Sequence, residues 1–148
     1  MSRSSACGDP RVTELVWDVD ACGTCAGNEG ATIRTGDDGD WRPEQLLALS
    51  LESDLMSGFI RLARQRGLRV LGYVSAAHFH PRAAGRARSH LCVHPCIVVG
   101  SQADAERARG IMAEVYAHSE LVALLRDAPR LELDVTAIDE QRLEIGQS

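Results

Sequence analysis

The sequence contains no lysine, and all sixteen of its cationic residues are arginine. This absence excludes a lysine Schiff base and a lysine general base from any activity of the chain. The formal net charge is −5, so the chain also lacks the excess of positive charge that binding to a phosphate backbone requires. We therefore expect no nucleic-acid partner.

Targeting segments and common enzyme signatures are missing as well. No charged and then apolar leader opens the chain, and no apolar run approaches the length of a membrane span, so we expect a cytoplasmic protein with no membrane partner. There is no His-Glu-x-x-His, P-loop, Gly-x-Ser-x-Gly or dinucleotide-binding fingerprint. The 148 residues suit a mobile, Ser-rich segment at 1–10 and a single domain at 11–148.

The stretch 41–67 predicts one long central helix. Pro43 suits the first helical position, and Gly67 can adopt the left-handed conformation that ends a helix. The apolar residues recur at helical spacing, and they are Leu46, Leu47, Leu51, Leu55, Phe59 and Leu62. A second stripe of small polar residues runs beside them, namely Ser50, Ser53, Asp54 and Ser57. Such a stripe either lines a pocket or lets another helix approach closely.

Strands are predicted on both sides of this helix. In chain order, we expect a strand at 12–19, a turn-rich segment at 20–30, a return strand at 31–35, the helix, strands at 68–79 and 89–99, helices at 103–116 and 120–126, and a last strand at 131–138. Serines precede both of the later helices as N-caps. The order predicts an α+β domain with antiparallel sheets around a long central helix.

The Arg-Pro-Glu-Gln-Leu-Leu segment that opens the helix, followed by small residues and an Arg-rich, Gly-terminated end, resembles the OsmC/Ohr family of thiol peroxidases. The resemblance covers roughly residues 12–138. It implies an OsmC-like fold, an intertwined homodimer with its two central helices buried together, a small-molecule substrate and an external thiol reductant. In that family a peroxidatic Cys follows ten residues after the helix-opening Glu, and a resolving Cys begins the short helix late in the chain.

Both family cysteines are absent from this sequence. Counting ten residues from Glu44 reaches Asp54, and His118 stands where the resolving Cys is expected. Neither residue can attack a peroxide as a thiolate does, so the usual peroxidase cycle is excluded at these positions. Asp54 and His118 could instead form an acid–base couple, two metal ligands or a polar pair without function. In the family the Glu that Glu44 matches pairs with an Arg, for which Arg34 is the nearest candidate.

Cys22-Gly-Thr-Cys25 is a dithiol motif near the N-terminus. Two thiols at this spacing can close a redox disulfide, present two thiolates to one metal, or simply lie at the surface. The resemblance places the motif near the family's active-site Arg, so it could be a relocated thiol centre. Cys22 and Cys25 would then be catalytic, and Glu44, Asp54 and His118 would shape the pocket.

Histidines and cysteines gather on the two strands that follow the helix. Period-two alternation puts every second residue of the later strand on one face, and its partners on the earlier strand lie opposite. The members are His78, His80, His90, Cys92, His94 and Cys96, and these six residues are called the His/Cys face below. Such ligands favour zinc, or copper or iron in another geometry. Pro95 could bulge the strand and put Cys96 out of phase, and an unligated surface is the alternative.

Three functions remain open. The first is thiol-dependent reduction of organic hydroperoxides, or of another small electrophile, by the Cys22/Cys25 dithiol. The second is a metal-binding or metal-dependent protein that uses the His/Cys face. The third is a non-catalytic binder of a small ligand with the OsmC fold.

Overall fold

The computed structural model describes residues 13–19, 22–27, 32–82 and 88–138. The segment at 1–10 that was expected to be mobile lies outside these residues. In chain order the elements are β1 (Thr13–Val19), β2 (Cys22–Gly27), β3 (Thr32–Gly36), α1 (Pro43–Gln65), β4 (Val70–His80), β5 (His90–Val99), α2 (Gln102–His118), α3 (Glu120–Leu124), β6 (Arg130–Leu131) and β7 (Asp134–Ala137). They belong to two compact units, Met1–Leu46 and Leu47–Ser148. The α+β class is confirmed.

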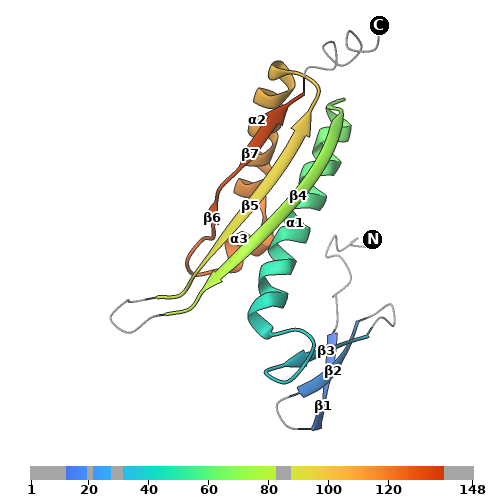
Figure 1. Cartoon of the computed structure of the whole chain (residues 1–148), viewed down its shortest axis with the longest axis vertical. Coiled ribbons are helices and arrows are strands. Elements are labelled where there is room, and N and C mark those ends of the chain that lie inside the picture. Colours follow the sequence, from blue (N-terminus) through green and yellow to red (C-terminus); the bar gives the residue numbers. More distant parts are fainter. Residues whose placement is uncertain (1–12, 20–21, 28–31, 83–87, 139–148) are drawn as a thin grey trace, which may run out of the picture. The chain divides into compact units, whose positions relative to one another are not determined.

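The first unit contains an antiparallel sheet in the order β1-β2-β3, drawn in blue in Figure 1. The middle strand corrects the sequence prediction. That prediction placed a turn-rich segment at 20–30 and paired the strands at 12–19 and 31–35 directly with each other. Thr24 of β2 instead pairs with Val16 of β1 and with Arg34 of β3. The Cys-Gly-Thr-Cys-Ala-Gly sequence has little strand propensity of its own. Backbone hydrogen bonds to a strand on each side therefore explain why it is extended.

Helix α1 begins and ends where its sequence predicts. Pro43 is its first residue. The side-chain oxygen of Gln45 accepts a hydrogen bond from the amide of Arg42 at 2.8 Å, which satisfies a donor before the first turn. At the other end Gly67 has φ 66°, and the amides of Gly67 and Leu68 donate to carbonyls of the last turn at 3.1 and 2.9 Å. This is the Schellman arrangement, which requires the left-handed residue.

The second unit is built on a four-stranded sheet in which β4, β5 and β6 are neighbours and β7 also pairs with β5. The β4–β5 pair is antiparallel, as expected. The predicted last strand at 131–138 is divided into β6 and β7, and both run parallel to β5. A parallel partner needs a crossover connection, and α2 and α3 supply it. Figure 1 shows α2 and α1 on the same side of this sheet.

The core of the second unit lies between that side of the sheet and the two helices. Its buried members come from α1, β5, α2 and β7, and they include Leu51, Leu55, Phe59, Val93, Ile97, Val99, Ala108, Ile111, Met112 and Val135. Ser50, Ser53 and Ser57 of the predicted polar stripe are exposed, and only Asp54 of that stripe is partly buried. None of the described helices is both long and apolar enough to cross a membrane.

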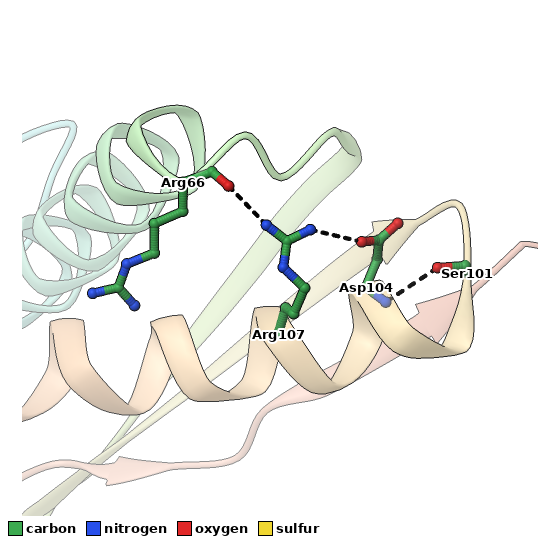
Figure 2. Close-up of polar contacts among 4 residues, drawn as sticks. All are labelled: Arg66, Ser101, Asp104 and Arg107. Carbon is green, nitrogen blue, oxygen red and sulfur yellow. Dashed lines mark hydrogen bonds and ion pairs between the residues drawn. The ribbon is translucent and has the colours of Figure 1, made fainter.

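Arg107 of α2 holds the C-terminal end of α1, as Figure 2 shows. Its guanidinium donates at 2.7 Å to the carbonyl of Arg66 and at 3.0 Å to a carboxylate oxygen of Asp104. Asp104 is itself fixed at the start of α2, because its amide donates to the hydroxyl of the N-cap Ser101 at 3.1 Å. The contact satisfies one of the carbonyls left free at a helix end and orients the two helices against each other.

Gly58 of α1 lies close against Val115 of α2. A Cβ added there would lie 2.8 Å from Cγ1 of Val115, a β-branched side chain that has little freedom to move. We expect Gly58→Ala to lower the free energy of unfolding by about 1–3 kcal/mol. Gly110→Ala in α2 is the matched control. It meets nothing within 4 Å, so it should raise stability by about 0.5–1 kcal/mol. Urea unfolding measures both changes, and a gain at both positions would contradict the close packing.

Tyr73 of β4 packs against Phe59 at a ring separation of 5.9 Å, and its buried hydroxyl has no hydrogen-bond partner among the described residues. Burial, with a smaller contribution from the Glu52 carboxylate, raises the pKa of Tyr73 from 10.0 to about 12. The unfolded chain therefore ionises first. Stability that is fully present below pH 10.0 should fall as the pH rises through about 12.

Tyr73→Phe is expected to remove this loss at alkaline pH while costing nothing at neutral pH, because the hydroxyl makes no hydrogen bond within the described part of the chain. The control is Tyr116→Phe, since the hydroxyl of Tyr116 donates to the carbonyl of Pro129 at 2.5 Å. That variant should lose about 1 kcal/mol at neutral pH. Urea unfolding at neutral and alkaline pH tests the pair, and an equal loss at neutral pH in both variants would contradict the unpaired state of Tyr73.

Candidate functional site

Strands β4 and β5 position the His/Cys face. In their ladder His78 pairs with Cys92, and His80 pairs with His90. This is the cross-strand arrangement that the sequence predicts. Side chains at paired positions on one face of an antiparallel sheet lie about 4.5–5.5 Å apart at Cβ, so the ladder itself brings imidazoles and thiol together.

Pro95 is accommodated in β5 without a bulge. It pairs with Ser75, and the only irregularity in the register of the described β4–β5 ladder lies between Val70 and Gly72, at the far end of β4. The bulge that Pro95 could have caused is therefore absent from the described β4–β5 ladder. Cys96 keeps the phase of the other members of the His/Cys face and is exposed.

The face is open to solvent except at its centre. His78, His80 and His90 are exposed and His94 is partly buried. Cys92 is only 5% exposed, although it lies on the side of the sheet that faces away from the core helices. It is therefore a thiol enclosed on an otherwise open face, with a histidine opposite it on β4 and histidines two positions before and after it on β5.

One group of candidate metal ligands spans the two strands. The ligand atoms of His80, His90 and Cys92 all lie within 4.8 Å of one another. The rings of His80 and His90 stack with their centroids 4.5 Å apart and an angle of 15° between their planes. Ligand atoms around a tetrahedral zinc ion lie about 3.3–3.8 Å apart, a separation that small side-chain rotations would produce here.

A second group uses a residue that the sequence prediction missed. Cys92, His94 and Glu132 place their ligand atoms within 4.8 Å of one another. Nδ1 of His94 lies 3.1 Å from a carboxylate oxygen of Glu132. The amide of Glu132 donates to the carbonyl of Val93 at 2.9 Å, so the backbone between β6 and β7 holds this carboxylate beside β5.

His78 and Cys96 belong to neither group. The ring of His78 nevertheless lies between the two, with centroids 5.0 Å from His94 and 6.2 Å from His80. It is thus available to either group after a rotation of its side chain. Cys96 lies two residues beyond His94 in β5. It is the one member of the His/Cys face that takes part in neither ligand group and in none of these ring contacts.

Asp54 and His118 line a separate pocket of about 470 Å³ between α1 and the end of α2. The direct partner of Asp54 is Ser119, whose hydroxyl donates to the carboxylate at 2.6 Å. Nδ1 of His118 lies 2.8 Å from the backbone carbonyl of Glu114 in its own helix. Asp54 and His118, which could have formed an acid–base couple, are therefore not in direct contact, and Ser119 takes the place beside Asp54.

The remaining predicted residues lie in the first unit. Glu44 forms an exposed ion pair with Arg42 at 3.8 Å, and its expected pairing with Arg34 stays a prediction. Cys22 and Cys25 lie in β2, where they pair with Gly36 and Ile33 of β3; their side chains are outside the described part. Alpha carbons three residues apart in a strand are separated by about 10 Å, whereas a disulfide needs about 4.4–6.8 Å. The extended backbone does not favour closure of this pair.

No family model and no curated protein matches the sequence. Solved structures do match it. An OsmC-like protein of unknown function from Vibrio cholerae has a TM-score of 0.71 over 86% of this chain and 99% of its own, at 11% identity. An organic hydroperoxide resistance protein, OsmC, from Legionella pneumophila has a TM-score of 0.64 over 88% and 98% of the two chains, at 14% identity. The chain has the OsmC fold. The organic hydroperoxide resistance protein OhrB of Bacillus subtilis agrees, with a TM-score of 0.62 over 86% and 98% of the chains, at 11% identity.

The OsmC fold confirms the resemblance that the sequence suggested, and at these identities the likeness establishes the fold alone. The resemblance put the two family cysteines at Asp54 and His118. The structure brings Asp54 to Ser119, the neighbour of His118, and not to His118 itself. Ser119 was recognised in the sequence only as an N-cap, and its position before a short helix was the signal that could have identified it.

Proposed function

We propose that this protein binds a transition metal ion, zinc in the first instance, on the His/Cys face through His80, His90 and Cys92. The observation that carries the proposal is the 4.8 Å limit on the distances between these three ligand atoms. Two imidazole nitrogens and a thiolate are preferred ligands of zinc. The β4–β5 ladder fixes the backbone of all three, so little conformational entropy is lost when the ion binds.

The composition of the site indicates how such an ion would behave. Three protein ligands leave one tetrahedral position free, which is the arrangement of catalytic rather than structural zinc sites. His80 and His90 are exposed, so a water molecule or a small substrate can reach the free position. The ion would convert the Cys92 thiol to a thiolate, which explains why a buried cysteine lies on the open side of the sheet.

Metal content and thermal unfolding test this proposal. Freshly purified, untagged protein should contain zinc or a related metal, and dialysis against a chelator should lower its unfolding temperature by several degrees, because the metal binds the native state. The His80→Ala/His90→Ala double variant should contain less metal and respond little to chelation. His118→Ala removes the fifth histidine, which lies outside the face, and should behave as the wild type. Metal-free protein that takes up no added zinc would refute the proposal.

A second candidate is thiol-dependent reduction of an organic hydroperoxide or another small electrophile. It is favoured by the OsmC fold and by two neighbours named as organic hydroperoxide resistance proteins. A thiolate of Cys22 or Cys25 would attack the peroxide oxygen and release an alcohol, leaving a sulfenate. The other thiol would displace water to close a Cys22–Cys25 disulfide, which an external thiol would reduce. Because both residues lie in β2, this route requires the strand to open.

Peroxide consumption in the presence of a thiol reductant separates the two candidates. The dithiol route predicts that Cys22→Ser abolishes turnover while Cys96→Ser, which changes an exposed thiol elsewhere, leaves it intact. Turnover that survives in a Cys22→Ser/Cys25→Ser variant would exclude the relocated dithiol. A chain that neither binds metal nor consumes peroxide would favour the third function, binding of a small ligand, for which the Asp54 pocket is the candidate site.

A further inference from the structure

The two groups of candidate ligands share a single atom, Sγ of Cys92. On one side of it are His80 and His90, and on the other are His94 and Glu132. We propose that the His/Cys face holds two metal ions and that the Cys92 thiolate bridges them. This inference rests on the proposed metal-binding function and deepens it.

The spacing of the ligands argues for two ions rather than one. His90 and His94 lie four residues apart on one extended strand, so their backbones are separated by about 13 Å. Cys92 is midway, about 7 Å along the strand from each. A single ion with bonds of about 2.0–2.3 Å cannot readily take both histidines. Two ions that share the central sulfur can each use one of them.

Each half of the site is complete enough to hold an ion. The first ion would have His80, His90 and the shared sulfur. The second would have the shared sulfur, His94 and Glu132, whose nitrogen and oxygen already lie 3.1 Å apart. Only the second half contains a carboxylate. The two halves should therefore bind a metal ion with different affinities.

Burial also fits a bridging thiolate. Cys92 and Glu132 would supply two negative charges toward the four positive charges of two divalent ions, and Arg130, 3.8 Å from the Glu132 carboxylate, adds a positive charge beside the second half. The sulfur belongs to the most buried of the ligand residues, as a group in contact with both ions should. His78, between the halves, can fill a fourth position on either ion. Ions held about 3.5–4 Å apart with free positions are typical of hydrolytic two-metal sites.

Titration of the metal-free, full-length protein with cobalt(II) tests the bridge, because cobalt bound to a thiolate gives a sulfur-to-metal charge-transfer band. The wild type should bind about two cobalt ions per chain, and the band should grow in both steps. His80→Ala and Glu132→Gln remove a ligand from opposite halves, and each should bind about one ion with the band retained. Cys92→Ser should lose the band, and Cys96→Ser should titrate as the wild type.

The outcomes separate this inference from the function on which it rests. Binding of one cobalt per chain with a charge-transfer band would overturn the bridge and leave a mononuclear site. No uptake of cobalt or zinc would overturn both. If Cys92→Ser fails to fold, as judged by circular dichroism, the other two variants decide. A bridge is overturned if Glu132→Gln leaves the stoichiometry and the band of the wild type unchanged.

Discussion

Replacing Leu55 with alanine is expected to lower the free energy of unfolding by about 2–5 kcal/mol. Leu55 is 0% exposed in the middle of α1, where it belongs to the core between that helix and the sheet of the second unit. The change removes buried apolar surface, and it leaves a cavity that neighbours such as Leu51 and Phe59 can fill only in part. Equilibrium unfolding in urea, with the slope compared between variants, measures the loss.

Leu124→Ala is the matched control for this effect. The same side chain is shortened by the same atoms, but Leu124 is 79% exposed in α3. Its loss should stay within about 0.5 kcal/mol, the usual range for surface substitutions. Equal losses at the two leucines would mean that α1 does not bury this side of its surface against the sheet.

The features that could be predicted from sequence are those set by local rules. Pro43 and Gly67 mark the ends of α1 because the backbone geometry at each end suits those residue types. The register of β4 and β5 could be predicted by centring the connection near residues 84–85, and the observed ladder agrees. The pairing of His78 with Cys92 can therefore be predicted from the amino-acid sequence alone.

The features that were missed depend on contacts between distant segments. β2 is a strand because strands on both sides bond to it, which a Gly-rich sequence does not reveal. Alternation identified 131–138 as extended, but it does not say that this segment runs parallel to β5. Glu132 could not be added to the His/Cys face without that pairing. Likewise, Ser119 rather than His118 meets Asp54, because the turn between α2 and α3 determines which of two adjacent residues faces α1.

Ser119→Ala is expected to lower the free energy of unfolding by about 2–4 kcal/mol. The hydroxyl has two roles. It accepts a hydrogen bond from the amide of Val122 at 3.1 Å as the N-cap of α3, a bond worth about 1 kcal/mol. It also donates to the carboxylate of Asp54 at 2.6 Å, and a bond to a charged group contributes about 1.5–3 kcal/mol.

Ser101→Ala separates these two roles. Ser101 caps α2 in the same way, by accepting from the amide of Asp104 at 3.1 Å, and its loss should cost about 1 kcal/mol. A double-mutant cycle of Ser119→Ala with Asp54→Ala should give a coupling energy of about 1–3 kcal/mol. If the two losses are simply additive, the hydrogen bond between Ser119 and Asp54 does not link α1 to the late helix energetically. If the coupling is present, Asp54, where the resemblance puts the peroxidatic cysteine, is tied to the start of the late helix by a hydrogen bond through Ser119, the neighbour of His118.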